Sequence, residues 1–108
     1  MGKVPSMPQW TRIASKSDLP APGQAREFEA AGKTICVANV DGKIAAMDNV
    51  CLHRGGSLGQ GVVLDGQVIC PWHGWAWNPQ SGQALQDPSF RVTVYPVRIE
   101  GDDVLVEI

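Results

Sequence analysis

The sequence predicts an all-β protein, an antiparallel sandwich or barrel of short strands. Three observations lead to this class. Runs of β-forming residues recur along the chain, turn signals such as Asp41-Gly42 and Asp65-Gly66 separate them, and no ten-residue stretch has helical periodicity. A chain of 108 residues is long enough for one domain with one modest core. We therefore expect a single all-β domain.

The expected strands fall into two groups, one on each side of a central segment. The first group spans 10–14, 24–30, 33–40 and 43–47, and the second spans 91–99 and 104–108. Trp10 is expected to anchor the core, and a turn or a single helical turn is expected over 15–20. Apolar residues alternate through 91–99, where Pro96 lacks an N–H and is therefore expected at an edge or a bulge.

The central segment carries two motifs that each offer one thiol and one imidazole. They are Cys51-Leu52-His53-Arg54-Gly55-Gly56 and Cys70-Pro71-Trp72-His73-Gly74-Trp75. The strands expected at 62–64 and 67–69 form a hairpin that returns the second motif beside the first. The chain has only two histidines, and both lie in these motifs. Four ligand side chains in two matched pairs predict a metal site.

The two motifs resemble the Rieske [2Fe–2S] fingerprint. The resemblance rests on the four ligands and their order, the glycines after each histidine and the proline after the second cysteine. In a Rieske centre two histidines replace two cysteines on one iron. The resemblance thus implies one Rieske-type [2Fe–2S] cluster per chain, with Cys51 and Cys70 on one iron and His53 and His73 on the other. A Cys₂His₂ zinc site is the alternative, although the single residue between Cys51 and His53 is short for one.

The resemblance extends from Trp10 to Ile108 and is nearest to the Rieske ferredoxins of ring-hydroxylating dioxygenase systems. It implies an antiparallel Rieske (ISP-like) sandwich or barrel with a small inserted cluster-binding subdomain. By position, a single Rieske domain of residues 1–108 would hold the cluster-binding subdomain at about 50–85. The β base domain would then comprise 9–49 and 86–108.

Four more residues of the motifs are expected to bind the cofactor: Arg54, Gly55, Gly74 and Trp75. Gly55 and Gly74 follow the ligands closely and let backbone amides approach the cluster sulfides, whereas Gly59 and Gly61 are expected only to make turns. Trp75 can form an apolar wall around the site, although packing beneath the loops would explain it equally. Arg54 adjoins His53 and is expected at a docking surface.

The sequence also departs from the membrane-anchored Rieske subunits. Gly56 and Trp72 stand where those subunits carry the cysteines of a disulfide between the two loops. Trp75 and Trp77 stand where they carry a serine and a tyrosine that donate hydrogen bonds toward the cluster. Because donors to the sulfurs raise the potential, the resemblance implies a potential on the order of −100 mV, in the lower part of the Rieske range.

Composition limits the location and the partners. A net charge of −2 argues against nucleic acid or an anionic membrane as partner. Cys36 lies outside the motifs in an apolar run and is expected to be a small buried hydrophobe. An odd cysteine without a disulfide framework suggests a reducing compartment, and no signal peptide or spanning helix is apparent. We therefore expect a cytoplasmic protein.

The expected function is electron transfer rather than catalysis. Rieske oxygenases need histidines for a separate mononuclear iron, and the cluster would use both histidines here. We expect a monomeric electron-carrying ferredoxin that meets a flavin-containing NAD(P)H reductase and a terminal oxygenase transiently. Two alternatives stay open: the small Rieske subunit of an assimilatory nitrite reductase, and a cluster-dependent redox or iron sensor.

Overall fold

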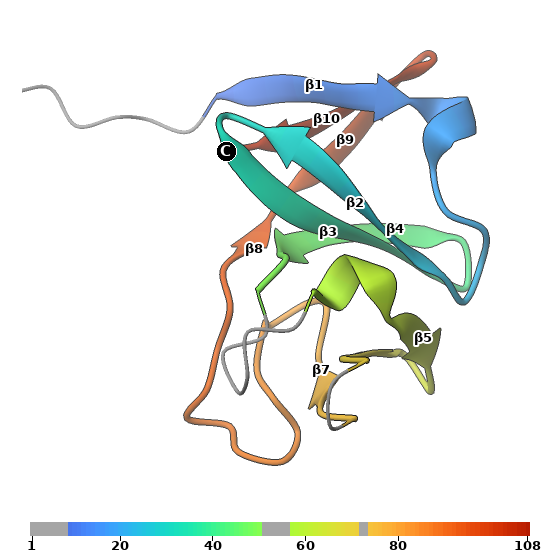
Figure 1. Cartoon of the computed structure of the whole chain (residues 1–108). Coiled ribbons are helices and arrows are strands. Elements are labelled where there is room, and N and C mark those ends of the chain that lie inside the picture. Colours follow the sequence, from blue (N-terminus) through green and yellow to red (C-terminus); the bar gives the residue numbers. More distant parts are fainter. Residues whose placement is uncertain (1–8, 51–56, 72–73) are drawn as a thin grey trace, which may run out of the picture.

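The computed structural model describes residues 9–50, 57–71 and 74–108, which form short strands and two 3₁₀ turns (Figure 1). The elements are β1 (Trp10–Ser15), η1 (Lys16–Asp18), β2 (Ala25–Ala30), β3 (Lys33–Val40), β4 (Lys43–Asp48), η2 (Leu58–Gln60), β5 (Val62–Leu64), β6 (Gln67–Ile69), β7 (Ala76–Trp77), β8 (Val94–Tyr95), β9 (Val97–Glu100) and β10 (Asp103–Glu107). None of the described helical segments is long and apolar enough to span a membrane.

The strands form three antiparallel sheets. Their orders are β1-β10-β9, β2-β3-β4-β8 and β5-β6-β7. In Figure 1 the first sheet lies at the top, the second crosses the middle, and the small third sheet lies at the lower end with η2. The all-β prediction is therefore confirmed. The third sheet and η2 come from the chain between the two ligand motifs and just beyond the second.

Two tight hairpins set the register around the site. Asp41 and Gly42 have φ of 54° and 92°, and Asp65 and Gly66 have φ of 51° and 77°. Positive φ at both central residues is the type I′ turn, whose twist matches that of the strands it joins. The predicted hairpin after Leu64 is thus confirmed, and it directs β6 back toward Cys70.

The middle sheet is buried on both faces. Side chains alternate along β3, so Cys36 and Ala38 join a core cluster with residues of η2, β6 and β7, including Cys70 and Trp77. Ile35 and Val37 face the other way, into a cluster with residues of β8 and β10. Burial on both sides explains why β3 reads as a continuous apolar run. Cys36 is buried as predicted.

The single strand predicted over 91–99 is wrong. The segment divides at Pro96 into β8, which pairs with β4 in the middle sheet, and β9, which pairs with β10 in the first sheet. Pro96 has no N–H for a ladder, while its carbonyl accepts the N–H of Glu107 at 3.0 Å. The chain therefore passes from one sheet to another at this residue, and the alternation of side chains does not continue through it.

Trp10 is not the core anchor that was predicted. It is 36% exposed, and the Arg98 guanidinium carbon lies 4.4 Å from the centre of its ring. Arginine stacks on aromatic faces through a cation–π interaction, which shields this tryptophan without burying it. Val104 and Val106 of β10 supply the fully buried side chains of the first sheet instead.

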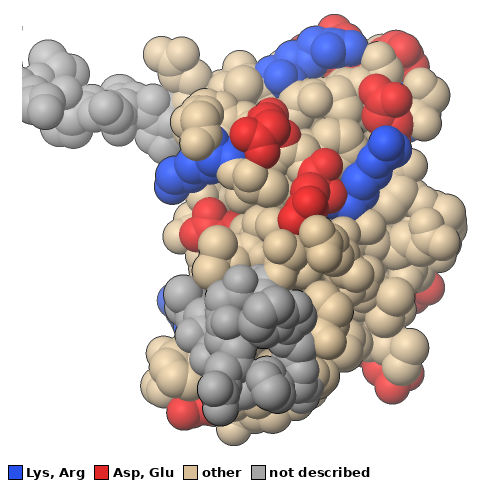
Figure 2. Space-filling view, in the orientation of Figure 1, with Lys and Arg blue, Asp and Glu red and all other residues tan. Residues whose placement is uncertain are grey.

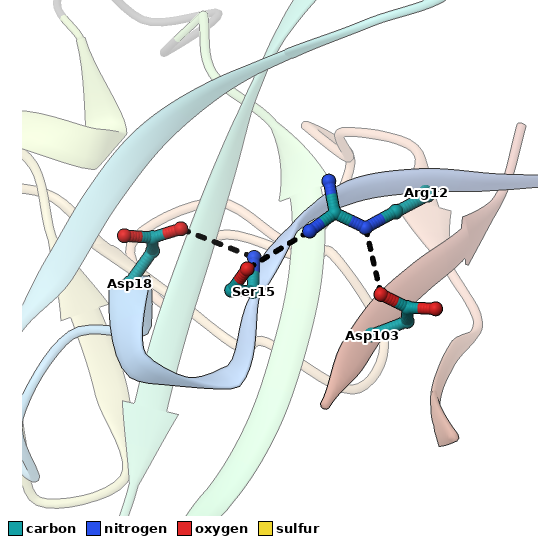
Figure 3. Close-up of polar contacts among 4 residues, drawn as sticks. All are labelled: Arg12, Ser15, Asp18 and Asp103. Atoms are coloured by element: carbon teal, nitrogen blue, oxygen red, sulfur yellow. Dashed lines mark hydrogen bonds and ion pairs between the residues drawn. The ribbon is translucent and has the colours of Figure 1, made fainter. Parts of the chain in front are cut away.

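A polar network ties the end of β1 to its neighbours (Figure 3). Arg12 Nε pairs with Asp103 Oδ1 of β10 at 2.8 Å, and Arg12 Nη2 donates to Ser15 Oγ at 2.8 Å. The Ser15 N–H then donates to Asp18 Oδ2 at 3.1 Å, which caps η1. The single helical turn expected here is confirmed. Because the ion pair is about half exposed, it contributes little stability.

Candidate metal centre

The structure describes part of the predicted site. Cys70, Gly74 and Trp75 lie within the described residues, and Cys51, His53, Arg54, Gly55 and His73 lie outside them. In the first motif the description stops at Val50 and resumes at Ser57. In the second motif it stops at Pro71 and resumes at Gly74. The described residues on either side of both gaps therefore define the base of the site.

Cys70 is delivered by β6 into a buried position. Val68 pairs with Trp77 and Ile69 with Ala76, and the Cys70 N–H continues this ladder by donating to the Trp75 carbonyl at 2.8 Å. Because side chains alternate along a strand, Cys70 lies on the same face as Val68 and Trp77. Its side chain belongs to the core cluster, and the residue is 1% exposed. The chain thus presents this sulfur to a dry, apolar environment.

Gly74 has a left-handed backbone conformation. Its φ is 69°, a value that residues with a Cβ rarely adopt. The glycine lies inside the loop that the Cys70–Trp75 hydrogen bond closes. This position therefore needs glycine for the backbone to turn between Pro71 and Trp75. Its contact with a cluster stays a prediction.

Three aromatic rings lie together where the second motif ends. The Trp75 ring lies 6.3 Å from the Trp77 ring and 5.5 Å from the Phe90 ring, centre to centre. Phe90 belongs to a loop that is anchored at Gln86, whose side-chain oxygen accepts the Ala76 N–H at 3.0 Å. Sequence reasoning missed Phe90; a lone aromatic residue in the polar Asp-Pro-Ser turn was the available signal.

The buried side chain of Trp77 suits a neighbouring group that accepts a hydrogen bond. Its side chain is fully buried, and its Nε1 has no hydrogen-bond partner among the described residues. Buried indole N–H groups usually have a partner, and Trp77 shares a core cluster with Cys70. Sulfur atoms of a cluster held by Cys70 would supply such an acceptor. A buried thiol beside an indole donor thus suits the predicted [2Fe–2S] cluster.

The base of the first motif is closed by main-chain contacts. Val50 and Ser57 form an antiparallel bridge across the gap. Just outside it, the Asn49 carbonyl accepts the Leu58 N–H at 2.7 Å, and Asn49 Oδ1 accepts the Gly59 N–H at 2.7 Å. Sequence reasoning missed Asn49. Its place two residues before Cys51 was a signal, because asparagine side chains in turns commonly bond nearby backbone.

Gly59 lies in the 3₁₀ turn η2 and Gly61 ends it, in line with the prediction that both make turns, and close packing is a second reason for glycine at both positions. Neither has a positive φ. A Cβ on Gly59 would lie 2.5 Å from Glu27 Cγ, and one on Gly61 would lie 1.9 Å from the Ile69 carbonyl oxygen. Both glycines allow close approach, the first of η2 to β2 and the second of η2 to β6. They hold the two flanks of the site together.

The surface near the first motif combines a pocket with exposed apolar side chains. A pocket of about 350 Å³ is lined by Lys33, Thr34, Asp48, Asn49, Val50 and Val92. Val50, which lines this pocket, is more than half exposed, and so is Leu85, whose N–H donates to the Ala76 carbonyl beside the second motif. On the face shown in Figure 2, charges of both signs are interspersed over the upper part.

Cys36 has a different character from a ligand cysteine. Burial, with a smaller contribution from the charge of Glu27, raises the pKa of its thiol to about 12. The thiolate is the form that binds metal, and at neutral pH this side chain is a neutral thiol. Its role is to fill the core beside Met47 and Leu58.

Comparisons with known proteins agree with this geometry. The model of the Rieske [2Fe–2S] domain matches residues 9–96. The biphenyl dioxygenase ferredoxin subunit of Pseudomonas sp. (strain KKS102) is 35% identical over 100 residues, which are 91% of each chain.

Two solved structures are similar over nine tenths of both chains. One is the ferredoxin in a complex of reduced oxygenase and oxidized ferredoxin in carbazole 1,9a-dioxygenase (TM-score 0.78, 27% identity, 91% of this chain and 92% of that one). The other is described as an NADH-dependent nitrite reductase small subunit from Mycobacterium tuberculosis (TM-score 0.84, 25% identity, 95% and 97%). The predicted fold and the predicted Rieske-type cluster, one per domain, are confirmed. The chain belongs to the family of Rieske [2Fe–2S] domain proteins.

Proposed function

We propose that this chain is a ferredoxin that accepts single electrons from a flavin-containing NAD(P)H reductase and passes them to a terminal oxygenase. The observation that carries the proposal is the similarity to a dioxygenase ferredoxin subunit over nine tenths of both chains. A similar ferredoxin has been solved in complex with its oxygenase, which supports an oxygenase as one partner. The reductase, a monomeric state and a cytoplasmic location are further parts of the proposal.

The proposed ligands are Cys51 and Cys70 for one iron and His53 and His73 for the other. When bound, the cluster supplies one-electron redox chemistry. The chain's own contribution is to bury Cys70 in the core and to turn the backbone at Gly74. Because the third sheet and η2 connect the two motifs, we propose that residues 50–85 act as the cluster-binding unit.

Three other residues of the motifs have supporting roles in this proposal. Trp75, whose ring contacts the tilted rings of Trp77 and Phe90, keeps water from the second motif. Gly55 lets the first loop approach the cluster, and Arg54 contributes to docking. Since the cluster uses both histidines, the chain acts as a carrier and leaves catalysis to the oxygenase.

Reconstitution tests the proposal. The chain is combined with the reductase and the oxygenase of a biphenyl dioxygenase system in place of their own ferredoxin, and dihydroxylated product is measured. We expect turnover that depends on the amount of chain added. The matched controls are Cys70→Ser, which removes a proposed ligand, and Cys36→Ser, which changes a buried thiol outside the motifs. Turnover that is equal with and without the wild-type chain would refute the carrier role in this system.

The nitrite reductase alternative has one specific observation in its favour, the similarity to a protein described as a small subunit of such an enzyme. A fixed subunit forms a stable complex, whereas a carrier binds its partners transiently. Size-exclusion chromatography of the tagged chain from its native host distinguishes the two. Elution as a free monomer supports the carrier, and co-elution with a nitrite-reducing large subunit supports the alternative.

A further inference from the structure

We propose that Asn49 is a positioning residue that, held by Glu27, keeps the first ligand loop in the geometry that retains the cluster. The inference rests on the proposed ligands, because Cys51 follows Asn49 by two residues. Neither Asn49 nor Glu27 belongs to a ligand motif, and neither is expected to touch the iron.

Asn49 joins the two ends of the first ligand loop. It follows β4 directly, and its carbonyl and side-chain oxygens accept the N–H groups of Leu58 and Gly59, each at 2.7 Å. Leu58 and Gly59 open η2, on the far side of the loop. The residue is 5% exposed, so water does not easily replace these bonds. One residue therefore ties the entry of the loop to its exit, through its main-chain carbonyl and its side chain together.

Glu27 sets the orientation of the Asn49 amide. Asn49 Nδ2 donates to Glu27 Oε2 of β2 at 2.6 Å. A carboxylate only accepts hydrogen bonds, so it selects the amide nitrogen and leaves Oδ1 for the Gly59 N–H. The three residues are closely packed, because a Cβ on Gly59 would lie 2.8 Å from Asn49 Oδ1 and 2.5 Å from Glu27 Cγ.

Loss of these bonds is expected to act on the cluster. A pocket is lined by Asp48, Asn49 and Val50, the last residues before the loop. Gly56 and Trp72 stand where a disulfide would otherwise join the two loops. Without that covalent tie, contacts at the base of the first loop and the cluster itself must hold the loop. Without the hydrogen bonds of Asn49, the two ends of the loop would separate more easily and iron would be released faster.

The chain contains a matched control for Asn49. Asn39 of β3 is also buried, at 8% exposure. Its Oδ1 accepts a glycine N–H, that of Gly42, at 2.7 Å, and its Nδ2 donates to the Pro20 carbonyl at 2.9 Å. Asn39 serves the hairpin at the opposite end of β4 from the ligand loop. The same substitution at both positions keeps the acceptor for the glycine N–H and removes the amide donor, which bonds the Glu27 carboxylate at position 49 and the Pro20 carbonyl at position 39.

The experiment compares cluster loss in Asn49→Asp and Asn39→Asp. Visible absorbance of the holoprotein is followed in excess chelator without denaturant, and thermal midpoints and reduced EPR spectra are recorded for each variant. We expect Asn49→Asp to lose the cluster about tenfold faster than wild type, which corresponds to about 1.4 kcal/mol, the scale of one buried hydrogen bond. Its EPR lines should shift or broaden. Asn39→Asp should lower the thermal midpoint but leave the rate and the spectrum within about twofold of wild type.

A charge-conserving double variant tests the mechanism. In Asn49→Asp with Glu27→Gln, the new carboxylate at position 49 can accept from the new amide at position 27, and it still accepts the Gly59 N–H. The net charge is that of wild type. We expect cluster retention to return to within about threefold of wild type. If Asn49→Asp does not fold, Glu27→Ala replaces it in the experiment, because this change lies outside the loop. Glu27→Ala should lose the cluster at least about threefold faster than wild type.

The outcomes separate this inference from the proposed function. Equal rates of cluster loss for Asn49→Asp and Asn39→Asp overturn it, as does a double variant that loses its cluster as fast as Asn49→Asp. If Glu27→Ala is the variant measured, a wild-type rate overturns it. In all these cases the wild-type protein still holds its cluster. Wild-type protein without iron and sulfide would refute the ligand assignment and the inference with it.

Discussion

Gly61→Ala should disrupt the seam between η2 and the strand that delivers Cys70. The added Cβ would lie 1.9 Å from the Ile69 carbonyl oxygen and 3.3 Å from that of Leu58. Contacts below 3.0 Å do not occur at real Cβ atoms, so the two segments must separate by about 1 Å. The obstacle is backbone rather than the end of a flexible side chain, and a rotamer change cannot relieve it.

The cost follows from this geometry. Overpacking a tight interior costs about 1–3 kcal/mol, and a backbone clash belongs near the upper end. For a chain of this size, 1 kcal/mol lowers the melting temperature by roughly 4 °C. We therefore expect Gly61→Ala to melt about 10 °C below wild type. The control is Gly101→Ala, where a Cβ meets nothing within 4 Å and only the φ of 60° is unfavourable. This control should lose about 1 kcal/mol, or roughly 4 °C.

Differential scanning calorimetry on the holoproteins measures both variants. Because Ile69 precedes Cys70, Gly61→Ala should also release its cluster faster at 25 °C, whereas Gly101→Ala should not. The reasoning is refuted if Gly61→Ala melts at or above the temperature of Gly101→Ala. A cluster that is retained equally in both would show that the seam does not position Cys70.

Three further outcomes are expected. Burial raises the pKa of Cys36 from 9.0 to about 12, so the stability that its neutral thiol contributes should be complete below about pH 9 and lost as the pH rises toward 12. Cys36→Ala should remove this loss of stability at alkaline pH. The same dependence of stability on pH in Cys36→Ala and wild type would contradict the expectation. Trp77→Phe removes the buried indole donor and should lower the midpoint potential in voltammetry by about 20–60 mV, the equivalent of one hydrogen bond, whereas a rise would place the indole elsewhere. Apo protein should keep its β-sheet circular dichroism while amides of 57–61 and 74–77 exchange faster than in holo protein, and equal protection would show that the cluster does not hold these segments.

Local turn chemistry made much of the fold predictable. The Asp-Gly pairs at 41–42 and 65–66 predict hairpins because both residue types tolerate positive φ. Each pair then sets the register of the strands beside it. The two ligand motifs were predictable for the same reason, since their ligand types and the glycine at position 74 can be read from short stretches of sequence.

Features that depend on distant residues were not predictable. The amide of Asn49 is oriented by Glu27, 22 residues earlier in the chain, and no local pattern links the two. Trp10 was predicted to lie in the core because a tryptophan is strongly hydrophobic. The sequence does not show that the Arg98 side chain, 88 positions later, covers its ring. Pro96 lies in an alternating run, and only the pairing of β8 and β9 with different sheets shows that the strand ends there.

The central claim is that this chain holds one Rieske-type [2Fe–2S] cluster between its two Cys/His motifs. EPR spectroscopy of the purified, dithionite-reduced protein, with iron, sulfide and zinc determined on the same sample, tests it most directly. We expect a Rieske-type signal with iron and sulfide in equal amounts, and no such signal in Cys51→Ser. Zinc in place of iron after expression with adequate iron, or a signal that survives in Cys51→Ser, would contradict it.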